Sequence, residues 1–148
     1  MKKLYILLVL LVIRPIHHEE IPPLKVETPI EWTILSAKEH KCLVDNVYYE
    51  ARGETPDGQR LVARTTLNRA KTSNVCTEVY KYKQFSWTLQ PQKRPNPITW
   101  AQVAKNVEFT IPGDHYYFHN TSVSPKWARF YVLLEKEGNH VFYSRTQI

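Results

Sequence analysis

The chain has 148 residues, of which 43% are hydrophobic and 23% are charged, a balance that predicts one ordinary globular domain and excludes a multi-domain enzyme. Its formal net charge of +6 favours polyanionic partners, which include nucleic acid, anionic lipid surfaces and the acidic polymers of cell walls. Charge alone does not choose among these three classes.

The N-terminus combines two lysines with an unbroken apolar run over residues 4–13. As a helix this run rises about 15 Å, which is short of a hydrocarbon core of about 30 Å. We therefore predict a signal peptide or signal-anchor over residues 1–20, with a buried N-terminal element as the alternative. Cleavage stays open, because no small-x-small pattern follows. Residues 21–35 read as a proline-rich linker, which leaves residues 36–148 as the domain.

The first predicted helix begins at Ser36, which has the spacing of a capping box with Glu39. Along this helix Leu43, Val47 and Glu50 are spaced i, i+4 and i+7, so they share one face. A carboxyl group held against apolar side chains has a raised pKa and can carry a proton near neutral pH. Glu50 is therefore a candidate general acid, and the alternative is a solvated glutamate that pairs with a nearby cation.

A second helix is predicted to begin after Thr55, with Pro56 in its first turn, and to run to about Lys71. We expect Gly53 to end the first helix in the left-handed conformation. Gly58 indicates a close approach at this corner, either by the first helix or by a ligand.

The chain has two cysteines: Cys42 on the first predicted helix and Cys76 just past the second. In an exported protein such a pair favours a disulfide, and two buried thiols are the alternative. A catalytic cysteine is not expected, because no histidine stands in a recognisable relation to either one.

Residues 81–97 are predicted to form a long loop that contains a Phe-Ser-Trp stretch. Exposed aromatic rings with neighbouring amides suit a sugar-binding wall, although Trp87 fits the role of a core anchor equally well. A third helix is predicted over residues 98–110, ended by Pro112 and Gly113.

The C-terminal part alternates between strand-like and helical patterns. Residues 114–120 are predicted to form a strand, residues 130–137 a helix and residues 140–143 a final short strand. The predicted fold class is mainly α, an α+β domain with a minor sheet. His115 and His119 do not indicate a metal site, because no third ligand has diagnostic spacing, and His119 is expected to hydrogen-bond in a cleft.

Several short motifs occur in order over roughly residues 40–144, and together they closely resemble the SleB-type cell wall hydrolase family. The resemblance implies a small fold similar to that of lysozyme-like lytic transglycosylases, acting on the glycan strands of peptidoglycan. The cysteine pair also resembles a feature of many relatives. The motifs are Asn46-x-Tyr48-x-Glu50-Ala51-Arg52-Gly53-Glu54, Gly58-Gln59, Asn68-Arg69, Gln84-Phe85-Ser86, Phe118-His119, Val123-x-Pro125-x-Trp127 and Gly138-Asn139-His140-Val141-Phe142-Tyr143.

Carried over residue by residue, the catalytic glutamate of the family corresponds to Glu50, and Glu54 matches a second glutamate with a supporting role. The sequence departs from the family pattern at Tyr117, where many relatives have a histidine, and at Asn120, where alanine is frequent. Substrate-binding roles are expected for Gln84, Ser86 and His119 as hydrogen bonders, and for Tyr48, Phe85 and Phe118 as cleft-lining rings.

Glycosidases usually need two carboxylates roughly 5 to 10 Å apart, and only Glu50 is well placed. A lytic transglycosylase can use one carboxyl group, which protonates the glycosidic oxygen and then takes the proton of the muramic acid 6-hydroxyl to close a 1,6-anhydro ring. We expect this route. If Glu54 or Asp57 orients a water instead, the enzyme is a hydrolytic muramidase.

We expect a monomer without cofactor, metal or nucleic-acid partner, exported to the periplasm or cell wall and associating transiently with the membrane through its leader. Its role is then wall remodelling or phage-type lysis. The competing hypothesis is a non-enzymatic module that binds polyanions or cell wall, but lysines and arginines scattered along the chain argue against it. An inactive enzyme-like fold is not indicated, because no motif residue is missing.

Overall fold

The computed structural model describes residues 28–29 and 35–148. The predicted leader over residues 1–20, and all but three residues of the predicted linker over 21–35, lie outside the described residues. The elements are β1 (Thr28–Pro29), α1 (Ala37–Ala51), α2 (Pro56–Arg69), η1 (Ala70–Thr72), α3 (Val75–Val79), η2 (Ser86–Leu89), α4 (Pro97–Asn106), β2 (Phe109–Thr110), β3 (His115–Asn120), η3 (Lys126–Phe130), β4 (Tyr131–Glu137) and β5 (His140–Gln147).

The two long helices begin where their caps predict. Ser36 and Glu39 form a complete capping box at the start of α1, and the Thr55 hydroxyl accepts from the Gly58 amide at the start of α2. The expectation for Gly53 was wrong, because Arg52 ends α1 in the right-handed region and Gly53 has no positive φ. The chain turns with a hydrogen bond from the Glu54 amide to the Ala51 carbonyl, which needs no left-handed residue.

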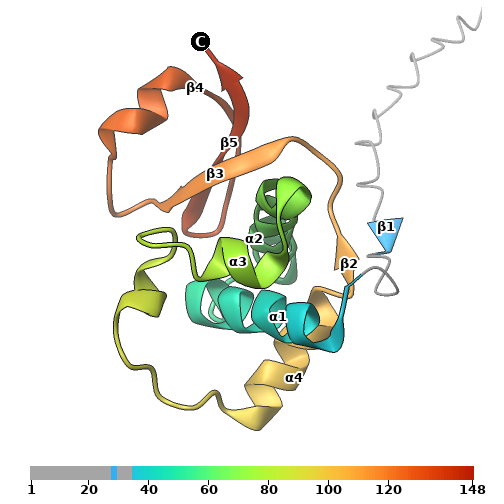
Figure 1. Cartoon of the computed structure of the whole chain (residues 1–148). Coiled ribbons are helices and arrows are strands. Elements are labelled where there is room, and N and C mark those ends of the chain that lie inside the picture. The colour runs from blue at the N-terminus through green and yellow to red at the C-terminus, as the bar shows by residue number, and fades with distance from the viewer. Residues whose placement is uncertain (1–27, 30–34) are drawn as a thin grey trace, which may run out of the picture.

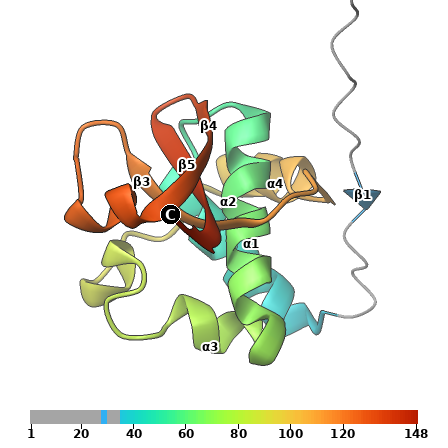
Figure 2. The ribbon, with the colours of Figure 1, turned by 90° about the horizontal axis from the view of Figure 1, so that it is seen from above.

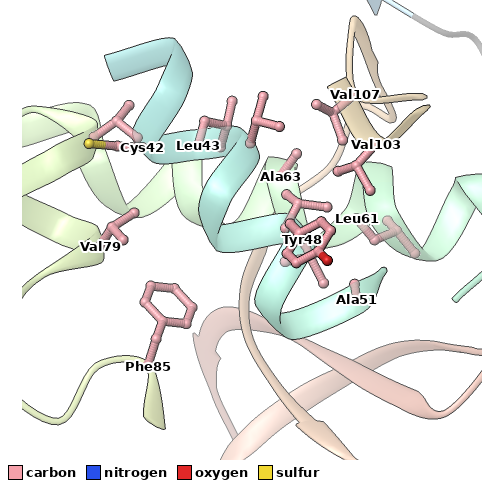
Figure 3. Packing of buried hydrophobic residues seen from close by; sticks show 14 of the residues in the cluster. Cys42, Leu43, Tyr48, Ala51, Leu61, Ala63, Val79, Phe85, Val103 and Val107 are labelled. Atoms are coloured by element: carbon pink, nitrogen blue, oxygen red, sulfur yellow. The ribbon is translucent and has the colours of Figure 1, made fainter. Parts of the chain in front are cut away.

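The hydrophobic core lies between the helices. Figure 3 shows Leu43 and Tyr48 of α1 in one cluster with residues of two other helices, Leu61 and Ala63 of α2 and Val103 of α4. A disulfide between Cys42 and Cys76 ties α1 to α3, with their Cα atoms 5.3 Å apart. The short helix α3 was not predicted from the sequence.

A three-stranded antiparallel sheet in the order β3-β5-β4 packs beside α2 (Figures 1 and 2). Phe142 of the central strand β5 is fully buried and joins the helical core. Separately, β1 pairs with β2, so part of the predicted linker is hydrogen-bonded to the domain. The fold is mostly helical with a small sheet, which confirms the predicted fold class.

Two predicted helices differ from the structure. Residues 130–137, predicted as helical, hold strand β4, which pairs with β5 from Tyr131 opposite Gln147 to Glu137 opposite His140. The helix predicted over 98–110 ends at Asn106 as α4, well before Pro112. In both cases pairing with a distant strand overrides local helix propensity. Within the described residues, no helix has both the length and the apolar character needed to cross a membrane.

Candidate active site

The C-terminal end of α1 faces a cleft of about 670 Å³ between the loop that follows α3 and the three-stranded sheet. Both walls carry aromatic rings, and polar side chains lie between them. The lining residues are Glu50, Arg69, Lys83, Gln84, Phe85, Ser86, Tyr117, Phe118, His119, Asn120, Val123, Trp127, Tyr131 and His140.

Glu50 lies in the last turn of α1, in the predicted position beside the apolar face. Its side chain is half-buried, and no hydrogen bond or ion pair joins it to the described part of the chain. Burial raises the pKa of the Glu50 carboxyl to about 7, since removal from water disfavours the charged form. Among the lining residues, Glu50 alone has a carboxyl group. The cleft therefore holds one acid that can gain and lose a proton near neutral pH.

Glu54 lies outside the cleft lining, and both of its carboxylate oxygens accept hydrogen bonds. Its two carboxylate oxygens accept from the Asn139 amide at 2.9 Å and from the Asn139 side-chain Nδ2 at 3.1 Å. Gly138, with φ 55°, lets the β4–β5 turn come this close, because a Cβ atom there would lie 2.1 Å from Glu54 Oε2. Thr55 reinforces the contact by donating to Glu137 at 2.7 Å. Glu54 thus joins the helical corner to the sheet.

This corner also explains Gly58, which the sequence marked as a point of close approach. A Cβ atom at Gly58 would lie 3.1 Å from Glu54 Cβ and 3.7 Å from Glu137 Cγ. The neighbours are therefore the preceding turn and strand β4, so neither the body of the first helix nor a ligand is needed to account for this glycine.

The loop wall of the cleft contains Gln84, Phe85 and Ser86, three of the residues for which substrate binding is expected. Phe85 is buried against the core, and Trp87 anchors the loop from behind. The Trp87 Nε1 donates to Asn46 Oδ1 at 2.8 Å, and its ring stacks on Tyr49 with centroids 4.6 Å apart. Trp87 does not line the cleft, so of its two predicted roles the structure supports the core anchor.

The sheet wall contains Phe118 and His119, and both ring nitrogens of His119 are hydrogen-bonded within the protein. Nδ1 lies 2.9 Å from the Asn120 carbonyl and Nε2 lies 3.0 Å from the Tyr143 hydroxyl. Because a carbonyl only accepts, Nδ1 donates to Asn120, and Nε2 shares a hydrogen bond with the Tyr143 hydroxyl. His119 therefore holds its part of the wall in place, and its nitrogens are not free for sugar hydroxyls.

Tyr48 is the other predicted site residue that the structure places outside the cleft lining. It is buried in the core, and its hydroxyl accepts from the Asn96 amide at 3.0 Å, which fixes the start of α4. The structure thus brings six of the predicted residues together, Glu50, Gln84, Phe85, Ser86, Phe118 and His119, and separates Tyr48 and Glu54 from them.

Sequence reasoning assigned no cleft role to several lining residues. Trp127 and His140 belong to the motifs shared with the SleB-type family, so the sequence could have indicated them. Tyr131 could not be assigned, because residues 130–137 were incorrectly predicted to be helical. Burial lowers the pKa of His140, so its imidazole is neutral at pH 7, and its buried Nδ1 has no partner among the described residues. Arg69 forms an ion pair with Glu78 at 2.8 Å.

In residues 28–29 and 35–148, no three His, Cys, Asp or Glu side chains gather closely enough to hold a metal ion.

Comparison with known proteins agrees with this fold and cleft. Residues 53–143 match the Cell Wall Hydrolase family. The structure is similar to the catalytic domain of the germination-specific lytic transglycosylase SleB from Bacillus anthracis, with a TM-score of 0.61 and 25% sequence identity over 74% of this chain and 97% of that one. The catalytic domain of the Bacillus cereus SleB protein gives a TM-score of 0.60 at 25% identity, over 74% of this chain and 91% of that one.

No curated protein sequence matches the chain significantly. The family match spans more than half of the chain, and the structural matches cover nearly all of both SleB domains. The chain therefore belongs to the cell wall hydrolase family and has the fold of a SleB catalytic domain.

Proposed function

We propose that this cell wall hydrolase is a lytic transglycosylase, which cleaves peptidoglycan between N-acetylmuramic acid and N-acetylglucosamine with Glu50 as its one acid and base. The observation that carries the proposal is the isolation of Glu50: it alone has a carboxyl group among the lining residues, and it has no partner among the described ones. Glu50 lies just before the range matched by the family, so its role rests on the geometry of the cleft.

The first step needs a proton on Glu50. Because burial raises the pKa of this carboxyl to about 7, roughly half of the molecules carry that proton at neutral pH. The carboxyl group donates the proton to the glycosidic oxygen, the bond from that oxygen to the muramic acid C1 breaks, and the N-acetylglucosamine end leaves as an alcohol. Glu50 is then a carboxylate beside a sugar that has positive character at C1.

The second step returns the proton to Glu50. The carboxylate takes the proton of the muramic acid 6-hydroxyl, and the oxygen of that hydroxyl bonds to C1 to close the 1,6-anhydro ring. Glu50 regains its starting state and no water is consumed. A neutral carboxyl group with a pKa near 7 suits both halves of this cycle, because it is a usable acid and its conjugate is a usable base.

Hydrolysis would require a second group to activate water. The two carboxylates considered for this role, those of Glu54 and Asp57, form hydrogen bonds outside the cleft. Glu54 binds Asn139, and Asp57 accepts from Arg60 at 3.0 Å; neither lines the cleft. A retaining or inverting glycosidase ordinarily places its second carboxyl within about 10 Å across the scissile bond. This arrangement favours the anhydro route over a muramidase.

Peptidoglycan binding is proposed for the two walls of the cleft. Aromatic rings such as Tyr117, Phe118, Trp127 and Tyr131 provide faces for sugar rings, and Gln84 and Ser86 provide hydrogen-bonding groups. We also propose that the protein acts as a monomer after export, with the N-terminal leader providing any contact with the membrane. Remodelling of the host wall and phage-type lysis are both compatible with this activity.

The test is mass spectrometry of the soluble fragments that the full chain releases from purified peptidoglycan, beside its Glu50→Gln variant. We expect fragments that end in 1,6-anhydromuramic acid from the native chain and none from the variant. Reducing-end fragments that disappear in the variant would replace the proposal with a muramidase, and fragments that persist in the variant would remove Glu50 from the chemistry.

A further inference from the structure

The segment that includes the loop wall of the cleft has a net positive charge. Between Glu78 and Glu108 there is no acidic residue, whereas five cationic residues occur in that interval. Sequence reasoning treated lysine and arginine as scattered and missed this segment. The five residues are Lys81, Lys83, Lys93, Arg94 and Lys105.

Lys83 is the member of this group that lines the cleft. It is also the non-glycine residue with a positive φ among the described residues, at 60°. For a residue with a Cβ atom this left-handed conformation costs about 1–2 kcal/mol, and glycine would adopt it without that cost. Conformational strain of this kind often occurs where a loop must present a side chain to a ligand.

The Lys83 ammonium has no carboxylate partner in the described part of the chain. Its Nζ lies over the Tyr82 ring at 5.0 Å, and the Tyr82 side chain is itself 78% exposed. Arg69, the other lining cation, is paired with Glu78 at 2.8 Å. Lys83 is therefore the cation of the cleft that has no carboxylate partner among the described residues, and it lies over the face of the Tyr82 ring.

We propose that Lys83 and Tyr82 form a subsite for the peptide stems of peptidoglycan, with the Lys83 ammonium binding a stem carboxylate. The inference rests on the proposed function. In a strand that carries its stems, the lactyl carboxyl of each muramic acid is bound in the amide link to the peptide, so the sugars are neutral and the anionic groups of the substrate are the carboxylates of the peptides. Those peptides are attached to muramic acid, which is the sugar that reacts at Glu50. A muramic acid that reacts at Glu50 therefore brings its peptide stem into the cleft whose lining includes Lys83.

The experiment measures binding by calorimetry, with tetrasaccharides that carry peptide stems and with the same tetrasaccharides stripped of them, in which each lactyl carboxyl is converted to a primary amide so that the sugars stay neutral. The Glu50→Gln chain is used so that neither probe is consumed. We expect it to bind the stem-bearing probe about two- to fivefold more tightly than the stripped one, with a preference that weakens as salt rises. Adding Lys83→Gln should remove the preference, and adding Lys83→Arg should keep it.

Lys105→Gln is the matched control, because Lys105 is an exposed cation of the same segment that does not line this cleft. This variant lowers the net charge equally and should leave the preference intact. The proposal is overturned if Lys83→Gln keeps the preference, if it weakens binding of both probes equally, if Lys105→Gln acts like Lys83→Gln, or if neither probe binds. Failure of the proposed function would be seen separately, as the absence of anhydro fragments from the native chain.

Discussion

The last turn of α1 and the corner that follows it each carry a glutamate, and the two carboxyl groups have opposite surroundings. Glu50 faces the cleft without a partner, and burial raises its pKa to about 7. Glu54, four residues further on, accepts two hydrogen bonds from Asn139 and holds the β4–β5 turn against the helices. A fully bonded carboxylate stabilises a contact, whereas a partly desolvated one without partners stays available for proton transfer.

The same comparison shows where the fold loses stability for the sake of the site. Leaving a half-buried carboxyl without hydrogen bonds is unfavourable, and the cost grows when the group is charged. The neighbouring contacts of Glu54, Thr55 and Gly138 stabilise the frame around it. Changes at the two glutamates should therefore affect different quantities, and the following predictions use that separation.

The largest effect is expected on catalysis at Glu50. Glu50→Gln keeps the size of the side chain but removes the acid, and we expect the rate of peptidoglycan cleavage to fall by about 10²–10⁴-fold. Glu54→Gln is the control, since it changes the matching charge outside the cleft and should retain most activity per folded molecule. Rates of fragment release, normalised by folded protein from circular dichroism, would decide. Equal losses of cleavage rate in both variants would contradict the different roles assigned to the two carboxyl groups.

The next largest effect is expected on stability, where the β4–β5 turn contacts Glu54. Gly138→Ala forces a side chain into the left-handed region and against Glu54 Oε2, so we expect it to lower the free energy of unfolding by about 2 kcal/mol. Gly53→Ala serves as the comparison, because a Cβ atom there meets nothing within 4 Å. Urea denaturation measures both. A Gly138→Ala chain as stable as the native one would contradict the packing role of Glu54.

Glu50→Gln should also change stability, and the direction depends on pH. The pKa of Glu50 in the folded chain is raised to about 7, above its unfolded value near 4.5, so the folded state binds more protons between these values. The native chain therefore loses stability as pH rises from about 4.5 through 7, because Glu50 must ionise in its buried position. At pH 8 the variant should be about 1–2 kcal/mol more stable than the native chain, after allowance for partial exposure. At pH 4 this difference should vanish, and a constant difference across pH would contradict the assigned pKa.

The last prediction concerns the pH dependence of the reaction itself. The first step requires protonated Glu50, so kcat/KM should fall about tenfold for each pH unit above 7. Initial rates on soluble glycan fragments between pH 5 and 9 would show it. A decline centred below pH 5 would mean that Glu50 is well solvated in the free enzyme.

Glu50 itself could be predicted from the sequence, because its placement follows from local rules. The capping box at Ser36 sets the start of the helix, and the spacing from Leu43 then fixes which face Glu50 shares. The same rule could have excluded Tyr48 from the cleft. Two residues along a helix are about 200° apart, so Tyr48 faces away from Glu50 and into the core.

The sheet wall could not be predicted in the same way. Residues 131–137 include leucine, glutamate and lysine, which favour a helix, and they become strand β4 only by pairing with β5. Without that strand, Tyr131 could not be assigned to the cleft. The bonds of Glu54 to Asn139 likewise join residues 85 positions apart, a relation that no local pattern contains.

The central claim is that one carboxyl group suffices because the substrate supplies its own nucleophile. It is tested most directly by running the reaction in water enriched in ¹⁸O and determining the masses of the newly formed muramic acid ends. The account predicts ends that are lighter by one water than a reducing end and that carry no ¹⁸O. Reducing ends that each carry one ¹⁸O would show that water attacks C1 and would contradict the account.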